Sequence, residues 1–265
     1  MHVNELIFFF FCFFFVSGTV NASGKSCREC RNNSKMLLDY DLHIGGLKAN
    51  LMGIEDVADV TEFLLDHFFS EEPLGKAIGV DVEVEVRPWL AKVVMHQVQE
   101  NISIVIRNFA SNGQLVAVCL NDVERDVDDT DDVTIGTSVE EQLHPAMWKI
   151  THLLMDLVQD IDLFGRFHTN AYVLLQILCV HPQYAGRGLA GKMVDMTERL
   201  ARGAGHSLII SEATSEYSAS AFIKAGYTVE NSIEYADYSL DGVERPFARN
   251  TGVHTSARLM IKQLL

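Results

Sequence analysis

Apolar residues recur at helical spacing where the chain first takes on a globular pattern. From Val57 to Phe68 they return every three to four residues, which predicts an amphipathic helix over residues 55–69. This helix is expected to end before Pro73, because the residue that precedes a proline disfavours the helical conformation. A second helix is predicted over residues 88–99, since a proline at the first helical position loses no hydrogen bond.

Strand-like runs follow these helices. Residues 102–107 and 114–120 flank the segment Ala110-Ser111-Asn112-Gly113, and an Asn-Gly pair between two such runs is typical of a hairpin. Apolar positions then predict one long helix over residues 147–164. Residues 172–180 (YVLLQILCV) form a continuous apolar run, which predicts a central strand buried on both faces.

The last third of the chain alternates helices and strands. A glycine-rich segment follows the central strand, and an apolar stripe after it predicts a helix over residues 189–200. The remaining predicted elements are a strand at 207–211, a helix at 218–224, and strands at 227–230, 233–238 and 257–262. This order indicates an α/β fold of the α+β type, with a mixed central sheet flanked by helices and a strand–helix–strand crossover in its middle.

The first 35 residues read as an N-terminal extension, and residues 36–265 as one domain. Residues 6–16 (LIFFFFCFFFV) are almost purely apolar, which is too short for a membrane span of roughly 20 residues but matches the core of a signal peptide. The preceding residues carry no Lys or Arg, so the usual basic start of a signal peptide is missing. Three interpretations stay open: a signal peptide, a membrane tether, or a stretch irrelevant to the fold.

The charge balance of the chain is acidic. Asp and Glu number 36 against 21 Lys and Arg, for a net charge of −15. Such a surface repels nucleic acid and anionic membranes and attracts cationic ligands such as amines. The densest acidic run covers residues 122–132, has no apolar periodicity, and is predicted to be an exposed loop. Membrane contact is expected only if the apolar N-terminal segment is retained.

The cysteines and histidines predict no metal site. Cys119 and Cys179 lie within apolar strand-like runs, which is typical of buried thiols in a reduced protein. Cys27 and Cys30 form a CxxC pair, but no second pair or nearby His pair completes a zinc site. The CxxC pair could be redox-active or form a disulfide only if this end of the chain is exported.

The glycine-rich segment His181–Lys192 (HPQYAGRGLAGK) lies between the predicted central strand and the next helix. Glycines there let a ligand approach the backbone closely, and free amides at a helix start favour an anion. A pyrophosphate fits this arrangement. The spacing matches neither a Walker loop nor the Rossmann fingerprint, and on its own the segment could also be a plain tight turn.

This segment resembles the acetyl-CoA loop of the GNAT superfamily of N-acetyltransferases, which has the form Q/R-x-x-G-x-G/A. The match lies at Gly188 and Ala190, and the chain departs from the pattern at Ala185, where Gln or Arg is usual. The resemblance implies a GNAT fold with a strand–glycine loop–helix site for acetyl-CoA. The residues that it implies for this co-substrate are Leu178, Cys179, Val180, Gly186, Arg187, Gly188, Leu189 and Ala190.

Four further segments resemble the arylalkylamine N-acetyltransferase-like branch of that superfamily, which includes dopamine N-acetyltransferases. Two carry most of the likeness, residues 68–74 (FFSEEPL) and 213–219 (ATSEYSA). The others are residues 162–164 with the strand that ends at Val180, and the C-terminal segments 235–238 and 254–260. The resemblance spans roughly residues 40–265. It implies an enzyme that transfers acetyl from acetyl-CoA directly to a small primary amine, an arylalkylamine such as dopamine or serotonin.

Glu72 is the candidate general base, because the catalytic glutamate of the family falls directly before this proline. An alkylamine is mostly protonated at neutral pH, so a base must remove a proton before it attacks the thioester. Burial beside Phe68 and Phe69 is expected to raise the pKa of Glu72 toward the working range. The alternative reading of Glu72 is an ordinary acidic residue that caps a helix.

Hydroxyl groups are implied near the thioester and the amine. Thr214 and Ser218 are four residues apart and match the family's serine region, although one of the two is also expected to cap the helix that contains Ser218. Many GNAT enzymes place a tyrosine acid where this chain has Phe222, so protonation of the departing thiolate falls to Ser218, Tyr217 or water. Tyr217 and His254 are further candidates for contact with the amine.

Two other functions remain open from the sequence. A non-catalytic acyl-CoA-binding protein would keep the fold and lose turnover; Ala185 and Phe222 permit it, and Glu72 argues against it. An acetyltransferase for polyamines or amino acids would suit the acidic surface. Because acetyl-CoA is mainly cytosolic, the catalytic domain is expected in the cytoplasm, with the N-terminal segment as a tether or signal peptide.

Overall fold

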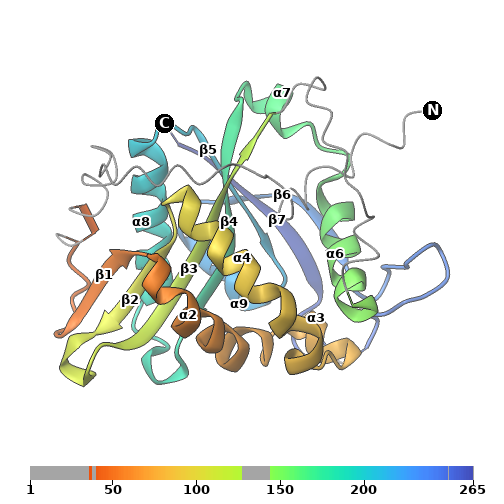
Figure 1. Ribbon diagram of the computed structural model, residues 1–265. Coiled ribbons are helices and arrows are strands. Elements are labelled where there is room, and N and C mark those ends of the chain that lie inside the picture. The colour runs from red at the N-terminus through yellow and green to blue at the C-terminus, as the bar shows by residue number, and fades with distance from the viewer. Residues whose placement is uncertain (1–35, 38–39, 127–143, 250, 265) are drawn as a thin grey trace.

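A seven-stranded mixed sheet lies at the centre of the computed structural model, which describes residues 36–37, 40–126, 144–249 and 251–264 (Figure 1). The strand order is β1-β2-β3-β4-β5-β7-β6. The neighbours pair antiparallel except for β4 and β5, which are parallel and joined through a helix. The strands are β1 (Leu47–Leu51), β2 (Ile104–Asn108), β3 (Gln114–Arg125), β4 (Ala171–Val180), β5 (Leu208–Ala213), β6 (Thr228–Glu234) and β7 (Ser256–Gln263).

Helices cover both faces of the sheet. One face carries α2 (Val57–Leu64), α3 (Pro73–Ile78), α4 (Arg87–Glu100), α6 (Pro145–Val158) and α7 (Leu163–Phe167), and the other carries α8 (Leu189–Gly203) and α9 (Glu216–Lys224) (Figure 1). The strand β4 contributes to the core on each face. Leu174 packs into one core and Leu175 into the other. This two-sided burial explains the continuous apolar run and confirms the predicted central strand.

The helix predicted over residues 55–69 is confirmed, and its last part has unusual geometry. It consists of a 3₁₀ turn at Ile54–Asp56, the helix α2 and a π-helical segment at Leu65–Phe69. Short π-helical segments occur often at functional sites. The π-helical segment of this chain ends three residues before Glu72, so the geometry of that segment sets the position at which the chain enters α3. The second predicted helix is confirmed as α4.

The parallel pairing of β4 with β5 is short. It joins only Val173 with Ile209 and Leu174 with Ile210, although β4 continues to Val180 and stays paired with β3 throughout. The hydroxyl of Ser211 donates to the carbonyl oxygen of Leu175 at 2.8 Å, just past the last paired residues. Beyond that point the two strands separate, and the carboxyl half of β4 presents one edge without a strand partner among the described residues.

The long helix predicted over residues 147–164 is wrong, because two helices occupy this region. The helix α6 ends at Val158, and Asp162 begins α7 by accepting a hydrogen bond from the amide of Gly165 at 2.8 Å. Leu157 and Leu163 nevertheless pack into the same core. The apolar periodicity therefore continues across the break and conceals it.

Two strand predictions are also corrected. The strand β3 extends to Arg125, and Asp122 is only 5% exposed, so the first part of the predicted acidic loop is buried sheet; residues 127–143 lie outside the described residues. The two strands predicted at 227–230 and 233–238 correspond to one strand, β6, which has a register shift between Val229 and Asn231 and ends at Glu234, so residues 235–238 are not part of a strand. Strand β1 was not predicted.

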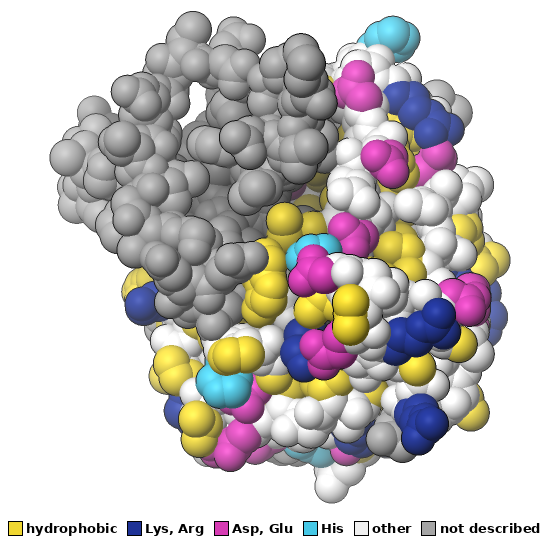
Figure 2. Space-filling view, turned by 90° about the vertical axis from the view of Figure 1, so that its right-hand side faces the viewer, with side chains coloured by type: hydrophobic (Ala, Val, Ile, Leu, Met, Phe, Trp, Pro, Cys, Tyr) yellow, Lys and Arg dark blue, Asp and Glu magenta, His cyan; other side chains and the backbone are white. Residues whose placement is uncertain are grey.

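The predictions for the N-terminal extension, including its apolar segment and its CxxC pair, concern residues outside the described ranges. No helix within the described ranges is both long enough and apolar enough to cross a bilayer. Cys119 and Cys179 are free, buried thiols, as predicted. On the face that bears α6, acidic and basic side chains of the described residues are interspersed, so the negative charge there is not gathered into one patch (Figure 2).

Candidate active site

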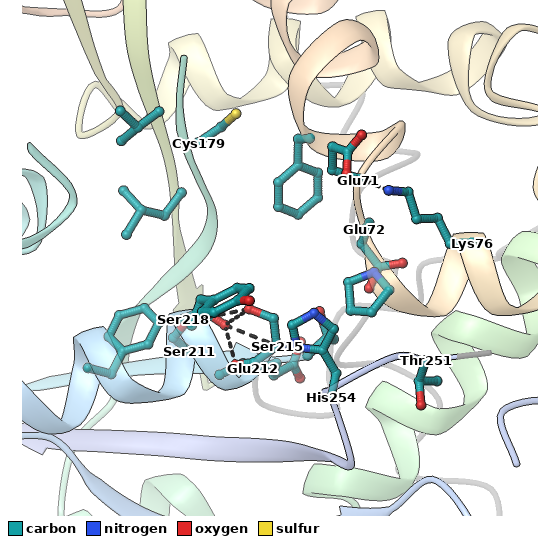
Figure 3. Close-up of a pocket in the computed structure, with 18 of the residues that line it drawn as sticks. Glu71, Glu72, Lys76, Cys179, Ser211, Glu212, Ser215, Ser218, Thr251 and His254 are labelled. Atoms are coloured by element: carbon teal, nitrogen blue, oxygen red, sulfur yellow. Dashed lines mark hydrogen bonds and ion pairs between the residues drawn. The ribbon is translucent and has the colours of Figure 1, made fainter. Parts of the chain in front are cut away.

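A cavity of about 590 Å³ opens where β4 and β5 separate. Its walls come from the ends of both strands, the start of α9, the turn that leads into α3, and residues 251–254 (Figure 3). Several predicted site residues from distant parts of the chain meet there. The predicted residues that line the cavity are Glu72, Leu178, Cys179, Val180, Thr214, Tyr217, Ser218 and His254.

Glu72 is held in place by the start of α3. It is the N-cap residue, with extended backbone angles (φ −63°, ψ 124°), and its Oε2 accepts a hydrogen bond from the amide of Gly75 at 2.6 Å. Pro73 occupies the first helical position, where its missing N–H is harmless. The second oxygen, Oε1, is buried and has no hydrogen-bond partner. Glu72 therefore caps the helix with one oxygen and keeps the other for a ligand.

The surroundings of Glu72 favour its neutral form. Burial raises the pKa of this carboxyl above its ordinary value, while the amides of Gly75 and Leu74 and the side chain of Thr214 lower the pKa in part. A carboxylate with a raised pKa in a cavity is a typical general base, because its affinity for a proton is closer to that of the group it must deprotonate. The predicted direction of the shift is confirmed.

The start of α9 confirms the predicted capping role of Ser218 and adds Ser215. Ser215 is the N-cap, and its Oγ accepts a hydrogen bond from the amide of Ser218 at 3.0 Å, while the Oγ of Ser218 completes a capping box by accepting one from the amide of Ser215 at 3.4 Å. The hydroxyl of Ser218 donates to the carbonyl of Ser215 at 3.0 Å and lies 2.9 Å from the hydroxyl of Ser215. Thr214 is thus free to face Glu72, and Ser218 presents an oriented hydroxyl to the cavity.

Tyr217 and His254, the further candidates for contact with the amine, lie at the outer part of the cavity. The rings of Tyr217 and His254 meet edge to face, with 5.2 Å between their centroids. The Nδ1 atom of His254 accepts a hydrogen bond from the amide of Glu216 at 3.1 Å, so its Nε2 carries the hydrogen when the ring is neutral. Tyr217 is 73% exposed. Both residues can contact a ligand at the mouth of the cavity.

The glycine-rich segment lies outside the cavity, at the end of β4. Gly186 (φ +72°) and Gly188 (φ +75°) have left-handed backbone conformations, and a Cβ atom added to either would meet nothing within 4 Å. Gly188 is the N-cap of α8, whose first backbone bond runs from the amide of Lys192 to the carbonyl of Gly188. The amides of α8 before Lys192 therefore have no carbonyl partner within the helix, an arrangement that fits a pyrophosphate.

The side chains around this loop have different roles. Leu189 is buried in the core beneath α8, so only its backbone is available to a ligand. The guanidinium group of Arg187 stacks on the ring of Tyr184, 5.0 Å from its centroid, and donates to the carbonyl of Gln183. These contacts hold the exposed loop in one shape.

Cys179 is not a nucleophile. Its thiol is buried, and burial raises its pKa to about 12, so the reactive thiolate is absent at neutral pH. This supports the prediction that β4 contributes backbone groups and packing rather than side-chain chemistry.

Sequence reasoning missed Glu212, the charged residue on the β5 wall of the cavity. Its Oε1 is buried and has no hydrogen-bond partner. Burial, together with the nearby Glu124, raises the pKa of Glu212 well above its ordinary value. The available signal was a lone acidic residue inside a short apolar strand, because such residues are rarely buried without a functional reason.

One group of side chains within the described ranges could hold a metal ion. The ligand atoms of His96, Glu100 and Asp122 lie within 4.8 Å of one another. Arg125 already forms an ion pair with Glu100 at 2.8 Å, so the protein supplies a cation of its own to this group. The expected absence of a metal remains a prediction.

Comparisons with known proteins identify the fold. No protein-family model matches the sequence. The structure is similar to arylalkylamine N-acetyltransferase 2 from Aedes aegypti, with a TM-score of 0.74 and 24% identity over 83% of this chain and 100% of that chain. A polyamine N-acetyltransferase from Drosophila melanogaster that forms N-acetylagmatine gives a TM-score of 0.69 and 23% identity over 82% and 100% of the two chains.

A third similar structure is an agmatine N-acetyltransferase mutant in its apo form. It gives a TM-score of 0.69 and 22% identity, over 83% of this chain and 100% of that chain. The chain therefore has the GNAT fold that its sequence predicts. This architecture places the strand–glycine loop–helix segment beside the cavity, as the resemblance implied.

Proposed function

We propose that this chain, which has the fold of the GNAT N-acetyltransferases, transfers an acetyl group from acetyl-CoA to a small primary amine. The observation that carries the proposal is the carboxyl group of Glu72, which keeps a buried oxygen without a partner in a cavity between β4 and β5. A spare buried acceptor of this kind costs folding free energy unless a ligand uses it. A protonated amine supplies the donor that this oxygen lacks.

The co-substrate fits the edge of the sheet and the start of α8. Acetyl-CoA supplies the acetyl group as a thioester. Free amides between Gly186 and Lys192 suit its pyrophosphate, because the helix start favours negative charge. The unpaired edge of β4 from Leu178 to Val180 suits the amides of the pantetheine arm, which can bond to it like an added strand. A dependence on acetyl-CoA supports a cytoplasmic location.

Glu72 is the proposed base for the amine. The unpartnered oxygen of Glu72 accepts a proton from the ammonium form of the acceptor, and the neutral amine then attacks the thioester carbonyl. The C–N bond forms, the C–S bond breaks, and the CoA thiolate that leaves takes up the proton that the amide nitrogen loses. Thr214 is a positioning residue, because its side chain tunes the pKa of Glu72. No acyl-enzyme is needed, and the high pKa of the Cys179 thiol supports direct transfer.

Ser218 is the proposed donor to the departing sulfur. Phe222, at the position where many GNAT enzymes have tyrosine, lines the cavity with a ring that is only 1% exposed and has no proton to give. The hydroxyl of Ser218 lines the same cavity and is oriented by Ser215. The single O–H of Ser218 donates to the carbonyl of Ser215 in this structure, so the hydroxyl rotates from that carbonyl toward the sulfur as negative charge develops on the leaving group.

Two acceptor classes suit the cavity wall. The ring of Phe68 lines the cavity and suits the aromatic part of an arylalkylamine, the class that the sequence resemblance favours. The carboxyl group of Glu212 suits a second cation, as in a diamine or agmatine. The named activities of the similar mosquito and fly structures cover both classes.

A panel assay tests the proposed function. The full chain is incubated with acetyl-CoA and tyramine, dopamine, serotonin, agmatine or 1,4-diaminobutane, and release of the CoA thiol is followed. Turnover of at least one amine, with the acetylated product identified by mass spectrometry, is expected. Tight binding of acetyl-CoA without thiol release across the panel would instead support the non-catalytic acyl-CoA-binding alternative.

Replacing Thr214 with valine is expected to move the acidic limb of the pH profile of kcat/KM to higher pH. Glu72 acts as a base only when deprotonated, and the Thr214 side chain lowers its pKa. Loss of the hydroxyl therefore raises the pKa and lowers activity on the acidic side. Thr214→Ser keeps the hydroxyl and should retain the original profile. An unmoved limb in Thr214→Val would show that Thr214 does not tune the base.

A further inference from the structure

Glu212 is a half-buried residue with one fully buried carboxyl oxygen and no counter-ion among the described residues. It lines the cavity from β5, and its Oε1 is buried without a hydrogen-bond partner. Among the described residues it forms no ion pair with Lys or Arg. Lys76 also lines the cavity, but it pairs with the exposed Glu71. A buried carboxylate without a partner is among the most costly side-chain states in a protein.

Acidic groups near Glu212 increase the free-energy cost of its charged form. Glu124 on β3 raises the pKa of Glu212, and burial together with Asp122 raises the pKa of Glu124 itself to about 8. The phenol of Tyr172 on β4 lies in the field of all three carboxyl groups. Arg125, the basic neighbour of Glu124, donates to Glu100. Arg125 and His96 offset part of the negative charge on Glu124 and Asp122, but no Lys or Arg among the described residues pairs with Glu212, and a cationic ligand would supply that partner.

The two carboxyl groups with an unpartnered oxygen line the same cavity. Thr214 follows Glu212 by two residues at the end of β5, which places their side chains roughly 7 Å apart along the strand direction. The side chain of Thr214 in turn contacts Glu72. Glu72 comes from the opposite wall, at the start of α3, and Figure 3 shows both carboxyl groups at the same cavity.

We propose that Glu212 binds the second cationic group of a dicationic acceptor, so that the cavity selects short diamines and agmatine-like guanidinoamines over monoamines. This inference rests on the proposed function, in which Glu72 takes the proton from the reacting amine. A ligand with one cation at each end satisfies both spare oxygens, whereas a monoamine leaves Glu212 unpaired. An ammonium or guanidinium group near Glu212 also favours its charged form and reverses the pKa shift.

The test compares matched acceptors with the full chain and with Glu212→Gln. With acetyl-CoA present, KM is measured for 1,4-diaminobutane and agmatine, and for the monoamines butylamine and tyramine. We expect Glu212→Gln to raise KM for the two dications about tenfold or more, because a hydrogen bond to a charged group is lost. Both monoamines should keep kcat/KM within about twofold.

The control is Glu55→Gln, which removes the same charge at an exposed residue far from the cavity and should change neither acceptor class. Thermal unfolding verifies that Glu212→Gln folds. An equal effect on dications and monoamines, or a wild-type preference for butylamine over 1,4-diaminobutane, would overturn the inference.

A second measurement separates this inference from the proposed function. If no amine is turned over, calorimetric titration of 1,4-diaminobutane into the protein with bound acetyl-CoA still reports on the cation subsite. Binding that is weakened about tenfold or more by Glu212→Gln would support the subsite even though acetyl transfer had failed. Undetectable binding, or equal binding by wild type and variant, would refute it.

Discussion

Replacing Glu72 with glutamine is expected to lower kcat/KM for the preferred amine by about 100- to 1,000-fold. Glutamine keeps an oxygen that can accept the hydrogen bond from the amide of Gly75, so the start of α3 should survive. It cannot take up a proton. The binding of acetyl-CoA should not change, because the proposed contacts with the co-substrate come from β4 and the loop at Gly188.

The pH profile gives the sharper readout for Glu72. Burial raises the pKa of this group, so wild-type kcat/KM should fall as the pH drops through a value above the ordinary pKa of a glutamate, and this limb should vanish in Glu72→Gln. Glu71→Gln is the matched control, since Glu71 is the exposed neighbour that pairs with Lys76. A Glu72→Gln variant that retains the rate and the acidic limb would assign proton removal to another group or to water.

Much of the fold could be predicted because local pattern and tertiary environment agree. Residues 172–180 read as a buried strand from composition alone, since β4 is covered on both faces. The pattern failed where one apolar stripe serves two elements. Leu157 in α6 and Leu163 in α7 pack into the same core. The apolar periodicity therefore gave no sign of the break between the two helices. The acidic residues at the end of β3 read as a loop, because their burial depends on distant strands.

The candidate site also contains residues that could be predicted from the sequence and residues that could not. Glu72 could be predicted as the base because residues 68–74 resemble the family's segment with its catalytic glutamate; the residues alone favoured a helix cap. Glu212 could not, because its significance comes from Glu124 on another strand and from the separation of β4 and β5. The capping role of Ser215 was missed because three neighbouring hydroxyl residues can each cap a helix, and only the exact first residue of α9 distinguishes them.

Replacing Gly188 with alanine is expected to raise KM for acetyl-CoA roughly tenfold. Gly188 has φ +75°, and a left-handed conformation costs alanine about 1–2 kcal/mol. The new Cβ would occupy the open space in front of the amides at the start of α8, where the pyrophosphate is proposed to bind. KM for the amine should stay within about twofold, since Gly188 does not line the acceptor cavity.

Gly205→Ala separates strain from ligand contact in this experiment. Gly205 lies just past the other end of α8, also has a left-handed conformation (φ +84°), and also faces open space. Both variants should therefore lose similar stability in thermal unfolding, because the backbone strain is the same in kind. Only Gly188→Ala should weaken the binding of acetyl-CoA, measured as KM and by titration. If the two variants weaken acetyl-CoA binding equally, the effect is transmitted through α8 as a whole. If neither does, the pyrophosphate does not bind at this helix start.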